Sequence, residues 1–316
     1  MPKLITITPN PAVDKSYQVP GFRAGQVQRA RAVRTTSGGK GINAARVLRT
    51  LAADVLALGF AGGATGDVLR TGLLSEGLPA EFVDVSPAET RLAILLLDTE
   101  SAEQTVVNEP GPELAETDLL RLMDIVRSRI EPGGFALFCG SLPPGLPDES
   151  YRRLIDAVSE VGARSLVDCT GPALRAALLA HPDVVKINRY ELGDFGYEIE
   201  DWNKDGPSVV EQFREVSAVR IAVVTDGGNG AIAAAGYRGI YAAAAPKLEV
   251  VSAVGSGDSF AAGLAYALCE SPDDIASALR LAGACGGANA LNEGAGYLTT
   301  EQIEAVSGRM QIAKMA

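Results

Sequence analysis

The sequence predicts an α/β fold with a mostly parallel central sheet and helices on both of its faces. Strand-like and helix-like segments alternate along most of the chain, which is typical of parallel strands joined by helical crossovers. The 316 residues suit one large domain, so we expect a single domain over 1–316. Hydrophobic residues make up 47% of the chain, which is enough for a sizeable core.

Short apolar runs predict the strands of the main sheet, namely "KLITIT", "DVLALGF", "FALFCG", "RSLVD", "DVVKI" and "RIAVVTD". A β-meander is expected over 229–252. Helical periodicity and capping residues predict helices over 40–53, 66–77, 113–130, 148–161, 171–180, 207–217, 258–269, 273–290 and 300–309.

Two segments interrupt the alternation, at 15–36 and 90–108. Both carry strand patterns with no helix between the strands, as in "TRLAILLLDTESAEQTVVN" at 90–108. We interpret them as a small β-sheet that stands off the main sheet as a lid. An exposed sheet with the run "LAILLL" needs a partner or a cover, so a homodimer through this lid is predicted.

Charge and composition exclude several classes of protein. The net charge of −11 argues against a nucleic-acid partner. No apolar run reaches the roughly 18–20 residues that span a bilayer, and the N-terminus is predicted to be a strand, so a cytoplasmic protein without membrane contact is expected. The 4 cysteines form no CxxC pair and are predicted to be buried thiols. With 1 histidine in the chain, a carboxylate is the expected general base.

One segment reverses the acidic balance. Between positions 10 and 50 the only acid is Asp14, whereas the bases are Lys15, Arg23, Arg29, Arg31, Arg34, Lys40, Arg46 and Arg49. Such a segment produces a local field for an anionic small molecule, or else a solvated strand face.

Two glycine turns each precede a helix, "SGGKGINAARVL" at 37–48 and "VGSGDSFAAG" at 254–263. The first is not a Walker loop, because Gly41 follows Lys40 where Ser or Thr is required. The second is not a dinucleotide fingerprint, because Phe260 occupies the third glycine position. Glycines and a helix N-terminus still offer backbone N–H groups to a negative charge, and Asp258 adds a carboxylate beside them.

The paired glycine turns resemble the two signatures of the ribokinase-like (phosphofructokinase B) carbohydrate kinases. The likeness extends to "TPNPAVD" at 8–14, "GSLPPG" at 140–145, "VKINRYE" at 185–191 and "VVTDGGNGA" at 223–231. Lys40 after two glycines is similar to the branch of 1-phosphofructokinase and tagatose-6-phosphate kinase, whereas "FAGGATG" at 60–66 resembles the minor 6-phosphofructokinase. The resemblance implies a three-layer α/β/α fold with a β-sheet lid.

The resemblance also implies roles in phosphoryl transfer from ATP to a sugar. Asp258 would be the base, and the backbone N–H groups of Gly255, Ser256 and Gly257 would form an anion hole. The sugar would be held by Asp14, Gly38, Gly39 and Asn43. The phosphate already on the sugar would be bound by Lys40, Arg91, Arg29 and Ser141, since guanidinium and ammonium groups suit phosphate.

The nucleotide side is expected in the second half of the chain. By resemblance, Asn188 and Glu191 would order Mg²⁺ through water, joined by Asp168; an ordinary helix cap is the alternative for this Asn-x-x-Glu motif. ATP would be contacted by Lys186, Thr225, Gly227, Gly230 and Asn289, with Asn289 near the adenine or else a helix-face amide. A monovalent-cation site, for K⁺, is implied at Ser252, Val254, Asn292 and Gly294.

The expected activity is ATP-dependent phosphorylation of a ketohexose phosphate, with fructose 1-phosphate converted to fructose 1,6-bisphosphate. Fructose 6-phosphate and tagatose 6-phosphate are alternative acceptors. Two further alternatives stay open: a kinase of an unphosphorylated sugar or nucleoside, and a catalytically silent sugar-binding protein, because a fold alone does not define an activity.

Overall fold

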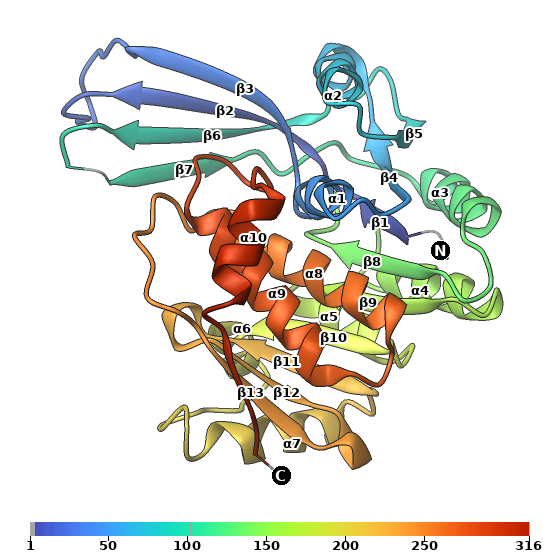
Figure 1. Cartoon of the computed structure of the whole chain (residues 1–316). Helices are drawn as coiled ribbons and strands as arrows, with labels where there is room; N and C mark the ends of the chain where they lie inside the picture. The colour runs from blue at the N-terminus through green and yellow to red at the C-terminus, as the bar shows by residue number, and fades with distance from the viewer. Residues whose placement is uncertain (1–3, 102, 316) are drawn as a thin grey trace.

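The structure is a computed structural model, and it describes residues 4–101 and 103–315. Within these residues the main sheet has ten strands in the order β14-β13-β12-β11-β10-β9-β8-β1-β4-β5 (Figure 1). The strands from β11 to β5 run parallel to their neighbours, and β12, β13 and β14 add an antiparallel edge. The bounds are β1 (Leu4–Thr8), β4 (Val55–Ala61), β5 (Ala80–Asp84), β8 (Phe135–Cys139), β9 (Arg164–Asp168), β10 (Val184–Asn188), β11 (Ile221–Thr225), β12 (Ala231–Ala234), β13 (Ile240–Ala244) and β14 (Gln311–Lys314).

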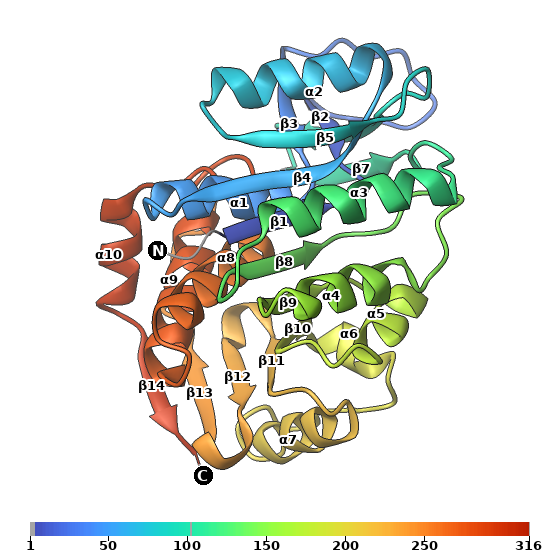
Figure 2. The same ribbon diagram turned by 90° about the vertical axis from the view of Figure 1, so that its right-hand side faces the viewer.

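Helices cover both faces of this sheet, and Figure 2 separates the two layers. One apolar core lies under α1 (Lys40–Thr50), α2 (Gly63–Ser75), α8 (Ser256–Glu270), α9 (Ile275–Ala290) and α10 (Thr300–Ser307). The other lies under α3 (Glu116–Arg129), α4 (Ser150–Glu160), α5 (Gly171–Leu178), α6 (Arg189–Gly193) and α7 (Gly206–Val216). Because side chains alternate along a strand, Leu4 of β1 enters the first core and Ile5 the second. The three-layer α/β/α prediction is confirmed.

A second sheet of four strands stands off the main one, in the order β3-β2-β6-β7 (Figure 1). Its strands are β2 (Ala12–Val19), β3 (Ala32–Gly38), β6 (Arg91–Asp98) and β7 (Gln104–Asn108). The parallel register of β2 and β6 sets Ala12 opposite Arg91 and Asp14 opposite Ala93. The two helix-free segments of the sequence therefore do form one small sheet, and this sheet brings Asp14 and Arg91 to the same end.

The predicted strands and helices are present, with their ends moved by a few residues. Three elements were missed: β5 and β14 are edge strands with little buried surface, and α6 is barely more than one helical turn. The expected meander over 229–252 is wrong in extent, because β13 ends at Ala244 and residues 245–255 form a loop.

The parallel strands place the chemistry at one edge of the sheet. Asp168 ends β9, Asn188 ends β10 and Thr225 ends β11, while α1 and α8 begin at the same edge. Carboxyl ends of parallel strands are where ligands bind in open α/β sheets. In the part of the chain that the structure describes, no helix is both long and apolar enough to cross a membrane.

Candidate active site

A cluster of opposite charges lies at the carboxyl ends of β9 and β10. The carboxylate of Asp168, 1% exposed, accepts hydrogen bonds from Lys40 Nζ at 3.1 Å and from Lys186 Nζ at 2.8 Å. Burial by itself would raise the pKa of Asp168, but the two ammonium groups hold it below its ordinary value. Asp168 in turn raises the pKa of Lys40, so Lys40 carries a positive charge at this edge.

This cluster bears on two expectations from the sequence, which stay predictions. Lys40 was expected at the phosphate already on the sugar, but it points to Asp168, on the side where Lys186 and Glu191 lie. Asp168 was expected in a Mg²⁺ water network, but both of its carboxylate oxygens are paired with lysine ammonium groups. The physical reason is that burying an ionised carboxylate costs free energy unless it is paired with a positive charge. The strand β10 supplies Lys186 and the first residue of α1 supplies Lys40.

Asp258 is the third residue of α8, and only 8% of it is exposed. Its Oδ2 accepts a 2.8 Å hydrogen bond from Asn43 Nδ2, on the first turn of α1. Burial raises the pKa of Asp258 to about 6, with Asp168 adding to the shift and Lys40, Asn43 and Lys186 opposing it. A carboxylate with such a pKa is ionised near neutral pH and is basic enough to accept a proton from an alcohol. It does not cap its helix, because its hydrogen bond crosses to α1.

The glycine turn before Asp258 leaves backbone donors at the helix start. Gly255 adopts a left-handed φ of 81°, and a Cβ there would lie 2.3 Å from the Cβ of Ala295. The anion hole expected from the sequence needs one correction: the N–H of Ser256 donates to Ala253 O at 3.1 Å. Within 4–101 and 103–315, the N–H groups of Gly255, Gly257 and Asp258 have no partner. Lys186 Nζ lies 3.1 Å from where a Gly257 Cβ would stand, so positive charge adjoins these donors.

Asp14 and Arg91 lie near Asp258, where the small sheet meets the main one. Burial raises the pKa of Asp14 to about 6, while the charges of Arg46 and Arg91 lower it and Asp258 raises it. Asp14 reaches this place because Gly38, opposite Ala12 on the neighbouring strand, has no side chain: a Cβ there would lie 2.0 Å from Asp14 Oδ2. Gly39 then caps α1 with no side-chain hydrogen bond. Asp14, Gly38 and Gly39 therefore lie together, and their role in holding a sugar stays a prediction.

Asn10 joins two of the predicted phosphate-binding residues and was missed in the sequence. Its backbone O accepts from Arg91 Nε at 3.2 Å, and its side chain donates to Ser141 Oγ at 3.3 Å. The segment "TPNPAVD" did contain a signal for Asn10: it is a polar residue between two prolines at the end of a buried strand. Polar residues are uncommon at buried positions, so its presence there indicates a specific hydrogen-bonding role. Arg29 lies apart from this group: it is exposed in the loop between β2 and β3.

The nucleotide-side residues lie at the ends of β10 and β11. Asn188 and Glu191 form a reciprocal capping box on α6, with Asn188 Oδ1 accepting from the Glu191 N–H at 2.9 Å and Glu191 Oε2 from the Asn188 N–H at 2.8 Å. Burial raises the pKa of Glu191. Thr225 Oγ1 donates to Ile187 O at 3.4 Å. Gly227 and Gly230 bound the short 3₁₀ turn that follows β11.

Asn289 does not have the position predicted for an adenine contact. Its side chain is 0% exposed. Its Nδ2 donates to Val254 O at 2.8 Å, and its Oδ1 accepts from the Gly296 N–H at 2.8 Å. With both ends of the amide engaged inside the protein, Asn289 braces the glycine turn instead of facing a base.

The predicted cation ligands belong to two loops. Ser252 and Val254 lie in the loop before α8, where Val254 O already accepts from Asn289. Asn292 and Gly294 lie after α9, and the side chain of Asn292 exchanges two hydrogen bonds with Gln302, of 3.0 and 3.1 Å. The described residues contain no cluster of three His, Cys, Asp or Glu side chains that could hold a metal ion. The K⁺ site stays a prediction.

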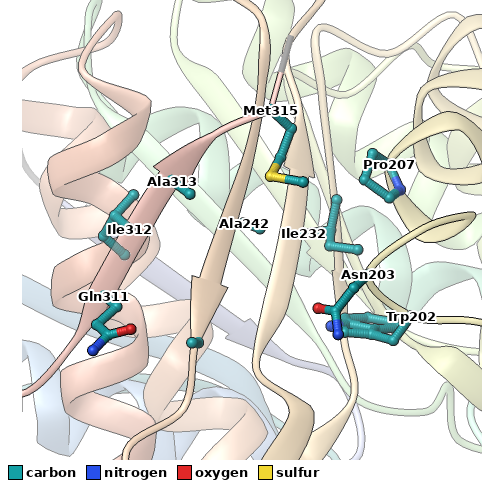
Figure 3. A pocket seen from close by; sticks show the side chains of 10 residues that line it. Trp202, Asn203, Pro207, Ile232, Ala242, Gln311, Ile312, Ala313 and Met315 are labelled. Atoms are coloured by element: carbon teal, nitrogen blue, oxygen red, sulfur yellow. The ribbon is translucent and has the colours of Figure 1, made fainter.

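A hollow of about 350 Å³ lies elsewhere, under the antiparallel edge of the main sheet (Figure 3). It is lined by Trp202, Asn203, Pro207, Ile232, Ala242, Ala244, Gln311, Ile312, Ala313 and Met315. None of these side chains is titratable. The hollow therefore has no part in the charge cluster described above.

All four cysteines are buried as free thiols, as the sequence predicted.

A buried carboxylate, a glycine turn with open N–H groups and paired lysines meet at the carboxyl edge of a doubly covered sheet, an arrangement that suits phosphoryl transfer. Comparison with known proteins gives the class. A family model described as "pfkB family carbohydrate kinase" matches residues 5–302, so the chain belongs to the pfkB family of carbohydrate kinases. Such kinases take ATP and a sugar substrate, and the family resemblance of the sequence is confirmed.

Individual relatives support this membership. The chain is 31% identical to 1-phosphofructokinase of Bacillus subtilis (strain 168) over 99% of its length and 100% of the relative's. It is 28% identical, with a TM-score of 0.89, to Escherichia coli phosphofructokinase-2 in complex with potassium, covering 98% and 99% of the two chains. Another crystal structure of that enzyme is of its tetrameric inhibited form. Ribokinase of Thermotoga maritima, 18% identical with a TM-score of 0.75 over 97% and 99% of the chains, shares the fold.

Proposed function

We propose that this carbohydrate kinase transfers the γ-phosphoryl group of ATP to fructose 1-phosphate, giving fructose 1,6-bisphosphate. The observation that carries the kinase chemistry is the buried Asp258, which Asn43 holds by a hydrogen bond and on whose pKa Lys40, Lys186 and Asp168 act. The full-length similarity to a 1-phosphofructokinase supports the choice of acceptor.

In this proposal the acceptor hydroxyl lies against Asp258. As its oxygen attacks the γ-phosphorus, the new O–P bond forms, the bond to the leaving oxygen of ADP breaks with its electron pair, and the hydroxyl proton passes to Asp258. Removing that proton in the transition state is general-base catalysis, which contributes typically about 10²–10⁴ in rate. The pKa near 6 leaves the carboxylate ready to accept it at neutral pH.

The charges around Asp258 suit the negative phosphoryl group. The open N–H groups of Gly255 and Gly257 lie at the positive end of α8, and Lys186 adjoins them. Lys40 extends this positive region from α1. Donors fixed before the reaction stabilise the charge without reorganising, which is why this arrangement is effective in a buried site. Lys40 is accordingly assigned to the transferred phosphoryl side and no longer to the acceptor's own phosphate.

Mg²⁺ fits the chemistry of Glu191 better than that of Asp168. Mg²⁺ is usually held by one or two carboxylates through water, with substrate phosphates completing its shell. The capping box engages one carboxylate oxygen of Glu191, and its raised pKa reflects burial close to Asp168. Bound there with ATP, the ion would neutralise charge on the β- and γ-phosphates. Thr225, Gly227 and Gly230 would then lie along the nucleotide, at the end of the neighbouring strand.

The phosphate already on the sugar is assigned to Arg91, with Ser141 beside it through Asn10. A guanidinium next to the sugar-binding Asp14 favours an anionic acceptor over an uncharged sugar or nucleoside.

The lid strands also suit a homodimer, because the β6 residues from Arg91 to Leu97 are only partly buried in one chain. The small sheet would close over the acceptor and exclude water, which otherwise competes for the phosphoryl group.

An acceptor panel tests this function. ATP consumption is measured with fructose 1-phosphate, fructose 6-phosphate, tagatose 6-phosphate, fructose and a nucleoside, and ³¹P NMR locates the new phosphate. The highest kcat/KM is expected with fructose 1-phosphate, with phosphate appearing at the 6-hydroxyl. A preference for either 6-phosphate would assign the enzyme to that acceptor instead. No turnover with any acceptor, in a folded protein that binds ATP, would favour a sugar-binding protein.

A further inference from the structure

A buried chain of polar contacts starts at the Asn43–Asp258 hydrogen bond and runs along α1 to the loop after α9. Asn43 Oδ1, the other end of the same amide, accepts a 3.0 Å hydrogen bond from Arg46 Nη1. Arg46 is only 5% exposed, and it lies one turn beyond Asn43 on the same helix. The catalytic carboxylate is therefore connected to an arginine that does not contact it.

Arg46 is held on several sides. Its Nε donates to Glu76 Oε2 at 2.6 Å and its Nη2 to Glu76 Oε1 at 3.0 Å, a bidentate ion pair. The same Nη2 donates to the backbone O of Ser37. Glu76 and Ser37 engage three of the five N–H groups of the planar guanidinium, which fixes its plane and directs one of the two Nη1 N–H groups towards Asn43.

Tyr297 completes the support from the loop after α9. Its hydroxyl donates to Glu76 Oε1 at 3.0 Å. Its ring has Arg46 at 4.7 Å and Arg34 of β3 at 4.8 Å from the centroid. Gly296 packs against α1, where a Cβ would lie 2.5 Å from Asn43 O. A cavity of about 350 Å³, lined in part by Arg46, Arg49, Glu76 and Tyr297, opens the outer end of this chain to solvent.

We propose that Arg46, held by Glu76 and Tyr297, is a positioning residue for the base: it fixes the Asn43 amide with its nitrogen towards Asp258. The inference rests on the proposed role of Asp258. The groups on either side determine the orientation of the Asn43 amide, because a guanidinium has only hydrogen-bond donors and an ionised carboxylate has only acceptors. An amide between the two must turn its oxygen to Arg46 and its nitrogen to Asp258.

Without Arg46 the amide is free to turn over. Asn43 Nδ2 is then held towards Asp258 by that one hydrogen bond alone, and whenever the amide turns away the carboxylate loses a donor that favours its ionised form. The charged groups that face Asp258 from the surrounding elements are Lys40 of α1, Asp168 of β9, Lys186 of β10 and Asp14 of β2. None of them contacts Arg46 through a hydrogen bond. The charge of Arg46 also lowers the pKa of Asp14, so a test of its hydrogen bond to Asn43 must keep that charge in place.

Two variants test the proposal. Arg46→Lys keeps the positive charge but cannot reach Asn43, Glu76 and Ser37 together. Tyr297→Phe keeps the ring and removes the hydroxyl that holds Glu76. Arg49→Lys is the matched control, because Arg49 lies on the same helix and lines the same cavity but is exposed. Circular dichroism and thermal denaturation confirm that each variant is folded.

The main readout needs no acceptor. The pKa of Asp258 is measured in the substrate-free protein by ¹³C NMR titration of its carboxyl carbon, which Asp258→Asn assigns. We expect Arg46→Lys to raise it by about half a pH unit to one unit, the equivalent of one lost hydrogen bond. Tyr297→Phe should raise it in the same direction by less, and Arg49→Lys should leave it unchanged. With the preferred acceptor, the acidic limb of kcat should move by the same amounts.

A double-variant cycle separates positioning from general stability. In an Asn43→Ala background, Arg46→Lys should cause no further rise of the Asp258 pKa, because Arg46 acts through that amide. An additive rise, or an unchanged pKa in folded Arg46→Lys, would overturn the proposal. If Arg46→Lys does not fold, an unchanged pKa in Tyr297→Phe overturns it. Failure of all acceptors in the activity assay would refute the kinase assignment while leaving this titration decisive.

Discussion

Asn43 on α1 and Asp258 on α8 are 215 residues apart in the chain and are joined by a 2.8 Å hydrogen bond. Each lies on the first turn of a helix that follows a glycine turn. The bond therefore brings the two glycine motifs of the sequence into one site. It also gives the buried carboxylate a donor, without which its ionised form would be more costly to bury.

Replacing Asp258 should abolish most of the turnover while sparing nucleotide binding. We expect Asp258→Asn to lower kcat by at least about 10², because general-base catalysis is lost. Steady-state kinetics and ATP binding by calorimetry check this. Asp124→Asn, on the exposed face of α3, is the control and should behave as wild type. Turnover close to wild type in Asp258→Asn would remove Asp258 from the role of base.

The same substitution should make the protein more stable at neutral pH. The pKa of Asp258 is raised from 3.8 in the unfolded chain to about 6 in the folded protein. The folded state thus binds this proton more tightly, and stability from this group is lost as the pH rises from about 4 to about 6. Asn cannot ionise, so Asp258→Asn should increase the free energy of unfolding at pH 8 by up to about 3 kcal/mol. Its Tm at pH 8 should rise accordingly. The gain should vanish near pH 4; an equal gain at both pH values would contradict the linkage.

Lys40 should act on kcat more than on acceptor binding. Lys40→Met removes one of the two charges that pair with Asp168 and one that lowers the pKa of Asp258. We expect kcat to fall by about 10², the cost of one preorganised donor. The acidic limb of its pH profile should also move to higher pH. Lys204→Met, an exposed lysine, is the control. A large rise in the sugar-phosphate KM with kcat preserved would return Lys40 to the acceptor's own phosphate.

Arg91 should affect the acceptor and not the nucleotide. Arg91→Ala removes a charged partner of a phosphate, which typically costs about 1.5–3 kcal/mol. The KM for the sugar phosphate should therefore rise about 10- to 100-fold, with the KM for ATP nearly unchanged. Arg31→Ala, exposed in the loop between β2 and β3, serves as the control. Equal effects on both KM values would place Arg91 outside the acceptor site.

The small sheet should change its dynamics when the acceptor binds. The segment 15–36 pairs with Asp14 on one side, and the segment 90–108 pairs with it on the other and carries Arg91. A sugar phosphate bound by Asp14 and Arg91 would therefore hold the small sheet closed. Amide hydrogen exchange in both segments should slow on saturation with fructose 1-phosphate, and ATP hydrolysis without sugar should be slow. Exchange that does not change in either segment would indicate a preformed, rigid site.

Much of the site could be predicted from the sequence, because its parts are local. Glycine before a helix, a carboxylate on its first turn and an Asn-x-x-Glu motif are each read within a few residues, and the structure forms each as a unit. Alternating strands and helices likewise determined the layered fold, since parallel strands require crossovers. The edge strand β14 could not be predicted in this way, because its pairing with β13 depends on residues far away in the chain.

The tertiary structure alone decided how the charges pair. Lys40, Lys186 and Asp168 come from three different elements, and the sequence did not indicate that they form one ion-pair cluster. The tertiary structure also decided that Asn289 binds the backbone of the glycine turn at Val254 and that Arg46 contacts Asn43. A buried charge or amide must find partners wherever the fold supplies them, and those partners are set by distances in space that residue types and spacing do not contain.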